Sequence, residues 1–153
     1  MPIYEEQLGD IFGYKADVIC CGVDDVGSTK GLCGKFCNKF EGFEDWYLDS
    51  CKKEMFLTSS LLTKTFKLND LSMMVAMIHC KDWEGCCLPK SLKLGLFELK
   101  EILLYLDKDA TVVMPPLGYT SKHYSLTKNQ IKGIIREVFW NIPCKIVLFN
   151  FEN

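Results

Sequence analysis

ADVICCGV, at residues 16–23, is a mainly apolar run that leads into the polar and glycine-containing sequence DDVGSTKG at residues 24–31. A short apolar run with β-branched residues, bounded by a turn signal, is typical of a strand buried on both faces. Such strands belong to sheets that helices cover on both sides. We therefore expect a buried strand here, a loop after it, and a helix after the loop.

Helices and strands alternate after this first strand. Apolar residues recur at helical spacing and predict one helix and then a second helical stretch, with Leu32, Phe36, Phe40 and Phe43 in the first and Trp46, Tyr47 and Cys51 in the second. Residues 56–66 and 73–79 then predict a two-stranded hairpin, with a turn signal at Asn69 and Asp70.

The second half of the chain continues the alternation. Residues 92–106 form an amphipathic helical pattern, and residues 110–114 predict a third buried strand that ends at two prolines, which supply no ladder donors. Thr127 is placed to cap a last helix, and residues 144–151 predict the final strand. We expect one α/β domain, residues 1–153, that binds ligands at the carboxyl ends of its strands, where residues 24–31 and 117–125 form loops.

Size and charge narrow the classes of ligand. At 153 residues and 48% hydrophobic composition, the chain has material for one substantial core. Its 18 basic and 20 acidic residues give a formal net charge of −2, which argues against a nucleic-acid partner. Because Arg136 is the single arginine, lysines and backbone N–H groups would have to hold an anionic ligand.

Cysteine and histidine usage predicts neither a disulfide framework nor a metal site. The nine cysteines are an odd number and include the adjacent pairs Cys20-Cys21 and Cys86-Cys87, so we expect reduced thiols. The sequence has no CxxC pair, and neither His79 nor His123 belongs to a motif with metal-ligand spacing. We therefore expect no metal and no cofactor.

The hydropathy pattern predicts a cytoplasmic protein without a membrane partner. The first ten residues, MPIYEEQLGD, lack the apolar core of a signal peptide. No apolar run approaches the length of about 18 residues that a membrane-spanning helix requires.

Four short segments stand in order along nearly the whole chain: Gly9-Asp10-Ile11-Phe12 with the strand after it, Lys30-Gly31-Leu32 before Phe36, Trp83 and Ser91 before Gly95-Leu96, and Met114-Pro115-Pro116-Leu117-Gly118. Their order and spacing resemble those of the macrodomain family, in particular its branch of ADP-ribose 1''-phosphate phosphatases. The resemblance implies a three-layer α/β/α fold with a central mixed sheet, and ADP-ribose or a close derivative as the ligand.

The resemblance also implies roles for two segments at the site. Asp10, beside Ile11, would accept a hydrogen bond from the adenine amino group, which suits a carboxylate because it is only an acceptor; the alternative is that Asp10 merely caps a turn. A loop would hold the pyrophosphate at the positive end of the following helix, and the alternative is an ordinary strand-to-helix turn. The residues of that loop are Gly27, Ser28, Thr29, Lys30 and Gly31.

A second loop would lie on the opposite side of the ligand and face the distal ribose and phosphate. Its residues are Leu117, Gly118, Tyr119, Thr120 and Ser121. At the end of the last strand, Phe149, or its neighbour Asn150 or Phe151, would stack on adenine, although each position is equally compatible with the core or the end of the chain.

Two departures from the family pattern concern catalysis. Where the family usually has an asparagine after its first strand, this chain has Asp24 and Asp25, and either carboxylate would act as a general base on water. The family's glycine-rich second loop is replaced by YTSKHY at residues 119–124. In a hydrolase, Lys30, Lys122 or His123 would stabilise the developing charge without a metal.

Three functions remain open from the sequence. The first is a hydrolase that acts on ADP-ribose 1''-phosphate or on ADP-ribosylated groups. The second is a non-catalytic reader of ADP-ribose, which the altered loops favour. The third is an interaction protein that has lost the ligand, which the bulk of Tyr119 and Tyr124 in the second loop favours.

Overall fold

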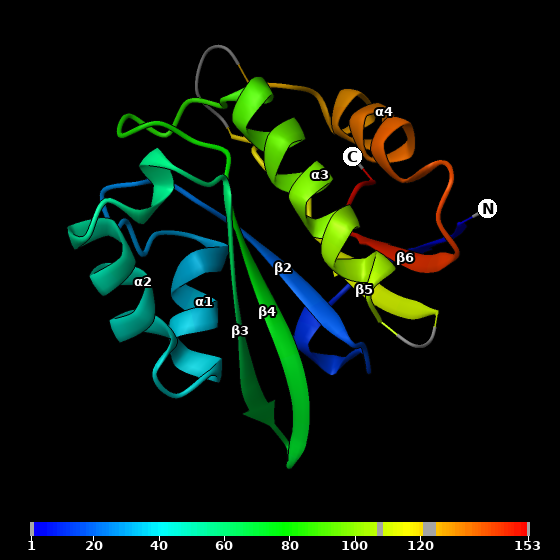
Figure 1. Cartoon of the computed structure of the whole chain (residues 1–153), viewed down its shortest axis with the longest axis horizontal. Coiled ribbons are helices and arrows are strands. Elements are labelled where there is room, and N and C mark those ends of the chain that lie inside the picture. Colours follow the sequence, from blue (N-terminus) through cyan, green and yellow to red (C-terminus); the bar gives the residue numbers. More distant parts are fainter. Residues whose placement is uncertain (1, 107–108, 121–124, 153) are drawn as a thin grey trace.

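A computed structural model describes residues 2–106, 109–120 and 125–152 (Figure 1). The strands are β1 (Ile3–Gln7), β2 (Val18–Val23), β3 (Leu61–Leu68), β4 (Leu71–His79), β5 (Ala110–Met114) and β6 (Cys144–Phe149). The helices are α1 (Leu32–Lys39), α2 (Phe43–Lys52), α3 (Pro89–Leu104) and α4 (Lys128–Phe139), with short 3-10 turns at Ile11–Gly13 and Met55–Leu57.

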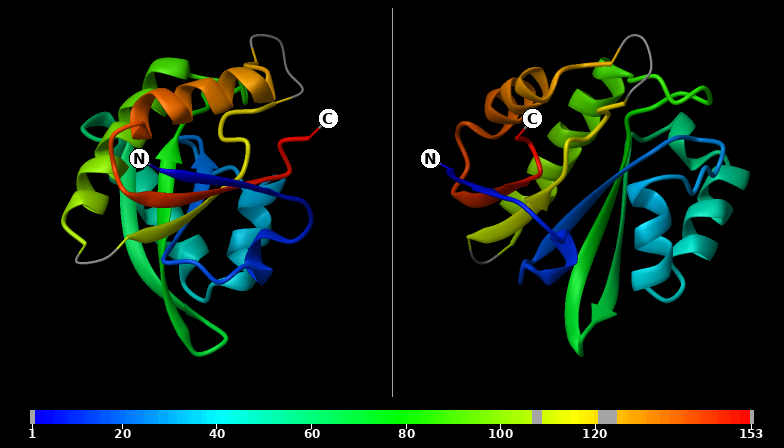
Figure 2. Two further views of the ribbon diagram at one scale, coloured as in Figure 1. Left: turned by 90° about the vertical axis from the view of Figure 1, so that its right-hand side faces the viewer. Right: turned by 180° about the vertical axis from the view of Figure 1, so that it is seen from behind.

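The strands form a single mixed sheet between two layers of helices. Their order is β1-β6-β5-β2-β4-β3, in which β3 is antiparallel to β4 and all other neighbours are parallel. Helices α1 and α2 cover one face, and α3 and α4 cover the other (Figure 1; Figure 2). The predicted three-layer α/β/α fold is therefore confirmed, and the five parallel strands all end at one edge of the sheet.

Strand β2 has a separate hydrophobic core on each of its faces. Val18 and Cys20 pack in the layer of α3 and α4, whereas Ile19 and Cys21 pack in the layer of α1 and α2. These four side chains are at most 1% exposed. Burial on both faces explains why the strand reads as a continuous apolar run instead of alternating with polar residues.

Some element boundaries differ from the sequence prediction. Strand β1 is not predicted, because its sequence IYEEQ carries polar side chains that an edge strand leaves exposed. Helix α3 begins earlier than predicted, at Pro89, since the fixed φ angle of proline suits the first helical position. Phe43, which its spacing assigns to the first helix, instead opens α2 after Gly42, whose φ is 86°.

Two local predictions are confirmed. Thr127 caps α4 in a capping box, in which its hydroxyl accepts from the Gln130 N–H at 3.1 Å and the Gln130 side chain accepts from the Thr127 N–H at 2.8 Å. Asn69 and Asp70, with φ of 53° and 63°, turn β3 into β4.

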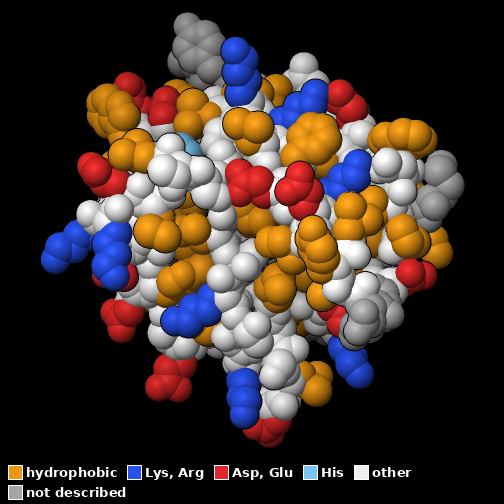
Figure 3. Space-filling model, viewed as in Figure 1, with side chains coloured by type: hydrophobic (Ala, Val, Ile, Leu, Met, Phe, Trp, Pro, Cys, Tyr) orange, Lys and Arg blue, Asp and Glu red, His pale blue; other side chains and the backbone are white. Residues whose placement is uncertain are grey.

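Two observations concern the predicted absence of nucleic-acid and membrane partners: the distribution of charged side chains on the surface, and the length and hydropathy of the helices. Figure 3 shows lysine, acidic and hydrophobic side chains interspersed over the face that it presents. Among the described residues, no helix has both the length and the apolar character needed to cross a bilayer.

Candidate ligand-binding site

Two cavities lie side by side at the carboxyl ends of the parallel strands. The larger, of about 640 Å³, is lined by segments that follow β1, β6 and β5, together with one side of α1. The smaller, of about 230 Å³, is lined by segments that follow β5, β2 and β4. Because these strands are neighbours in the sheet, the two cavities form an elongated site along one edge.

The first turn of α1 lies where the two cavities meet. Leu32 lines the larger cavity and Cys33 the smaller. Gly31, the N-cap residue, has φ of 62°, and no side chain among the described residues caps this helix. Its first N–H groups therefore remain open to a ligand, and the positive end of the helix, with Lys30 beside it, favours an anion.

Asp24 holds the loop between β2 and α1 in shape. Its side chain is 7% exposed, and its Oδ1 accepts hydrogen bonds from the N–H groups of Val26 and Ser28 at 3.1 and 3.2 Å. The buried hydroxyl of Tyr47 on α2 donates to the same oxygen at 2.6 Å. Burial, together with this carboxylate, raises the pKa of Tyr47, so the phenol stays protonated and remains a donor.

The same loop packs closely on the start of α1. A Cβ atom at Gly34 would lie 2.3 Å from the carbonyl oxygen of Thr29, a distance that backbone atoms do not tolerate. Glycine at this position therefore allows the loop to rest against the first helical turn, where it forms a wall of the smaller cavity.

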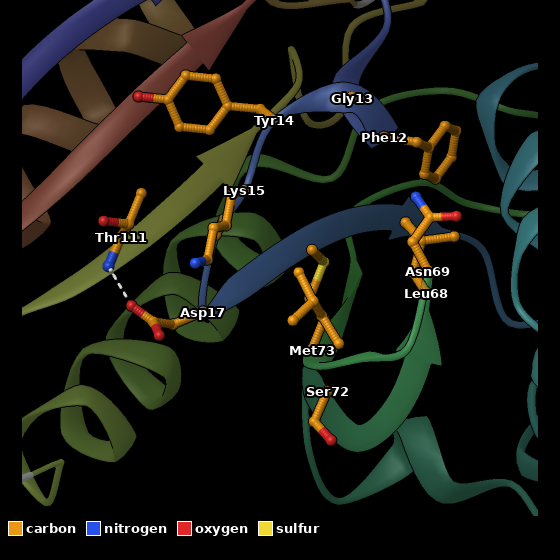
Figure 4. Close-up of a pocket in the computed structure, with 12 residues that line it drawn as sticks. Phe12, Gly13, Tyr14, Lys15, Asp17, Leu68, Asn69, Ser72, Met73 and Thr111 are labelled. Carbon is orange, nitrogen blue, oxygen red and sulfur yellow. Dashed lines mark hydrogen bonds between the residues drawn. The ribbon is translucent and has the colours of Figure 1, made fainter.

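A further cavity, of about 540 Å³, lies at the opposite edge of the sheet (Figure 4). It is bordered by the segment before β2, by the turn between β3 and β4, and by Thr111. The Asp17 carboxylate there accepts a hydrogen bond from the Thr111 N–H at 2.9 Å. Ligands of open α/β sheets bind at the carboxyl ends of strands, so we assign the candidate site to the other edge.

Comparison with solved structures identifies the fold. The chain superimposes on the macrodomain of Mycobacterium tuberculosis DarG with a TM-score of 0.84 and 18% identity, over 97% of this chain and 98% of that one. The macrodomain of Thermus aquaticus DarG gives a TM-score of 0.72 and 15% identity, over 98% and 99% of the two chains. This chain has the macrodomain fold. Thermosipho africanus DarTG, solved in complex with ADP-ribose, gives a TM-score of 0.76 and 19% identity over 97% of this chain and 43% of that one.

No protein-family profile and no curated protein matches the sequence. The similarity of this chain to known macrodomains is therefore a similarity of fold, found at identities below 20%.

Within the macrodomain fold, Asp10 occupies the rim of the larger cavity. Its Oδ1 accepts a hydrogen bond from the Phe12 N–H at 3.0 Å and caps the 3-10 turn at Ile11–Gly13. The turn-capping alternative is thus confirmed, while contact with adenine stays a prediction. The two roles are compatible, because this hydrogen bond uses one oxygen of an exposed carboxylate.

Asn150 secures the segment that carries Asp10. Its side-chain amide accepts from the Gly9 N–H at 2.9 Å and donates to the Gly9 carbonyl at 3.0 Å. Asn150 also lines the larger cavity, so this end of β6 contributes a polar wall to it.

Several predicted site residues lie away from the two cavities. Phe149 is buried at 3% exposure with its ring edge-on to Tyr14, because β6 is covered on both faces and its side chains fill both cores. Leu117 is likewise a core residue, at 1% exposure. Asp25 borders a separate cavity with Cys51.

Among the remaining predicted residues, Ser28, Lys30, Tyr119 and Thr120 line the smaller cavity. Gly27 and Gly118 have φ of 80° and 78° and shape the two loops. The predictions for Ser121, Lys122 and His123 fall outside the described residues.

Sequence reasoning missed Lys81 as a site residue. It follows β4 and lines the smaller cavity together with Asp24 and Lys30. Trp83 lines the same cavity and is 71% exposed at its rim. Its position in the sequence could have identified it. A lysine just after a buried parallel strand lies at the same edge of the sheet as the loop after β2.

Proposed function

We propose that this chain binds ADP-ribose, with the adenosine in the larger cavity and the distal ribose in the smaller one. The observation that carries the proposal is the pair of cavities that flank the uncapped start of α1. An elongated ligand with a central pyrophosphate has the matching form, since its anionic middle would meet the positive end of the helix. The Thermosipho africanus protein, part of which has the same fold, was solved in complex with ADP-ribose, and this supports the choice of ligand.

The available cations fit a pyrophosphate held by the backbone and by lysines. The guanidinium of Arg136 lies on α4 with its central carbon 5.4 Å from the ring of Tyr4, away from both cavities. Lys30 and Lys81 line the smaller cavity instead. A lysine acts on a phosphate as a point charge, so the N–H groups of the loop and helix would provide the directional hydrogen bonds.

Calorimetric titration tests the proposal directly. We expect ADP-ribose to bind to one site per chain and NAD to bind more weakly, because the nicotinamide adds a bulky group to the distal ribose, for which the smaller cavity offers about 230 Å³. No heat of binding with ADP-ribose, or a higher affinity for NAD, would contradict the assignment.

The Asp10→Asn variant is expected to lower ADP-ribose affinity without lowering stability. Asparagine retains an oxygen that accepts from the Phe12 N–H, but it places an amide donor where the second carboxylate oxygen would accept from adenine. We expect a loss of about 1–3 kcal/mol in binding, typical of a charged hydrogen-bond partner that is removed.

The control for this variant is Asp49→Asn, which changes an exposed carboxylate on α2. Titration and thermal unfolding of both variants separate the two effects. A folded Asp10→Asn protein with unchanged affinity would remove Asp10 from the ligand site.

We further propose that residues lining the smaller cavity catalyse the hydrolysis of a bond at the distal ribose, such as the phosphate ester bond of ADP-ribose 1''-phosphate. Asp24 and Lys81 both line this cavity, and they offer an acceptor for a proton from water and a positive charge for the leaving group. The three hydrogen bonds described for the Asp24 carboxylate all end on Oδ1, which leaves Oδ2 as the oxygen to contact water. Phosphate release from this substrate under metal-free conditions tests the step, and binding without turnover would instead identify a reader.

A further inference from the structure

Three thiols meet at the wall of the smaller cavity. Cys33, in the first turn of α1, lines the cavity and is 4% exposed. Cys21, on β2, shares one buried core with Cys33, and Cys37, one turn further along α1, packs against that core. All three are free cysteines. A small solute that enters the cavity would thus meet Cys33 first.

The surroundings of Cys33 favour its thiolate. The neighbouring Cys21 thiol lowers the pKa of Cys33, and the Lys81 ammonium lowers it further, against the opposing effects of burial and of the Asp24 carboxylate. The open N–H groups at the start of α1 act in the same direction, because a helix N-terminus stabilises a thiolate.

Two half-buried thiols of the chain are less acidic although they are easier to reach. Cys37 and Cys51 are partly exposed, yet burial raises the pKa of each to about 11. Reactivity toward oxidants follows the thiolate fraction as well as access. Cys33 therefore combines a cavity wall, a neighbouring cation and two neighbouring thiols.

We propose that Cys33 is the site at which a hydroperoxide oxidises this protein, and that the product is a disulfide between Cys33 and Cys21. The Cys33 thiolate attacks the O–O bond, so that an S–O bond forms and the alcohol or water leaves after protonation. The Cys21 sulfur then attacks the Cys33 sulfenic acid, the S–S bond forms, and the S–O bond breaks. The departing hydroxide takes the Cys21 proton and leaves as water, so the hydroperoxide is the only oxidant required.

Helix geometry selects Cys21 over Cys37 as the partner. Residues four apart on a helix have Cβ atoms about 5–6 Å apart, whereas a disulfide needs a Cβ separation of about 3.5–4.5 Å. Cys21 lies on β2 in the same buried cluster, so the spacing of residues along a helix does not fix its distance from Cys33. Cys20 does not compete, since its side chain packs in the opposite layer of the fold.

The disulfide would change the ligand site. It would tie the first turn of α1 to β2 at the wall of the smaller cavity, where the helix start faces the proposed pyrophosphate position. We expect oxidation to weaken ADP-ribose binding reversibly, a consequence that rests on the proposed function. The disulfide itself forms independently of that function.

The test treats the reduced protein with hydrogen peroxide and maps its peptides without reduction. We expect a Cys21–Cys33 link and an intact mass lower by two hydrogens, both reversed by dithiothreitol. Cys33→Ala should abolish the link, and Cys37→Ala should retain it. Cys21→Ala should leave a Cys33 sulfenic acid that dimedone traps. Mapping of the unsubstituted protein does not depend on how these variants fold, and a link between other cysteines, or no oxidation at Cys33, would overturn the proposal.

Protection by ligand provides a second measurement. Saturating ADP-ribose should slow the oxidation of Cys33, because the ligand would fill the cavity through which peroxide arrives. If ADP-ribose binds and Cys33 is oxidised at an unchanged rate, the access route is wrong and the proposal fails. If ADP-ribose does not bind, the proposed function fails, and the peptide map alone still decides whether the disulfide forms.

Discussion

Asp24→Asn is expected to lower the turnover of ADP-ribose 1''-phosphate by at least about a hundredfold, the usual loss when a general base is removed. The neutral amide of asparagine, unlike the aspartate carboxylate, does not act as a base that takes a proton from water. Asp25→Asn should leave turnover close to that of the parent protein. Asp25 borders a different cavity from Asp24, so its carboxylate does not face the proposed substrate position.

The asparagine variant also preserves the loop. Its side-chain oxygen still accepts from the N–H groups of Val26 and Ser28 and from the Tyr47 hydroxyl, so thermal unfolding should show a small change. Affinity for ADP-ribose should be retained or improved, since a negative charge near the ligand phosphates is removed.

The measurement is phosphate release by the parent protein and both variants without metal. Equal turnover in all three would exclude Asp24 as the base. A parent protein that binds ADP-ribose without turnover would support a reader, and one that binds nothing would support an interaction protein.

The central strands could be predicted from the sequence because burial on both faces leaves a direct trace in composition. β2 and β5 appear as short apolar runs, and the cap at Thr127 follows from local chemistry alone. β1 could not be found this way. It is an edge strand whose pairing with β6 depends on contacts far away in the sequence.

The sequence allowed us to predict which loops form the site, but only some of the side chains that line it. The loop after β2 and the segment after β5 both reach the cavities, as the strand order requires. The sequence does not show which of Asp24 and Asp25 faces the smaller cavity. In the structure, the Tyr47 hydroxyl on α2 donates a hydrogen bond to the buried Asp24 carboxylate, a contact between residues far apart in the sequence. Phe149 shows the reverse case, where an aromatic residue at a strand end belongs to the core.

Gly34→Ala is expected to destabilise the protein by about 1–3 kcal/mol, the usual cost of overpacking, even though alanine is the better helix former. The new methyl group would meet the Thr29 carbonyl oxygen at 2.3 Å. The Thr29 carbonyl oxygen belongs to the backbone, and the new Cβ atom is bonded directly to the backbone of residue 34. A side-chain rotation therefore cannot relieve the clash. The loop at residues 24–30 would have to move away from α1, and ADP-ribose affinity should fall with it.

Gly133→Ala is the matched control. Gly133 lies inside α4, where an added Cβ has no atom within 4 Å, so the same substitution should stabilise the protein by about 0.5–1 kcal/mol. Urea unfolding of the two variants should therefore shift in opposite directions, with ADP-ribose affinity reduced only in Gly34→Ala. Stabilisation by both substitutions would show that the loop does not rest on the first turn of α1, and the wall of the smaller cavity would then have to be assigned to other residues.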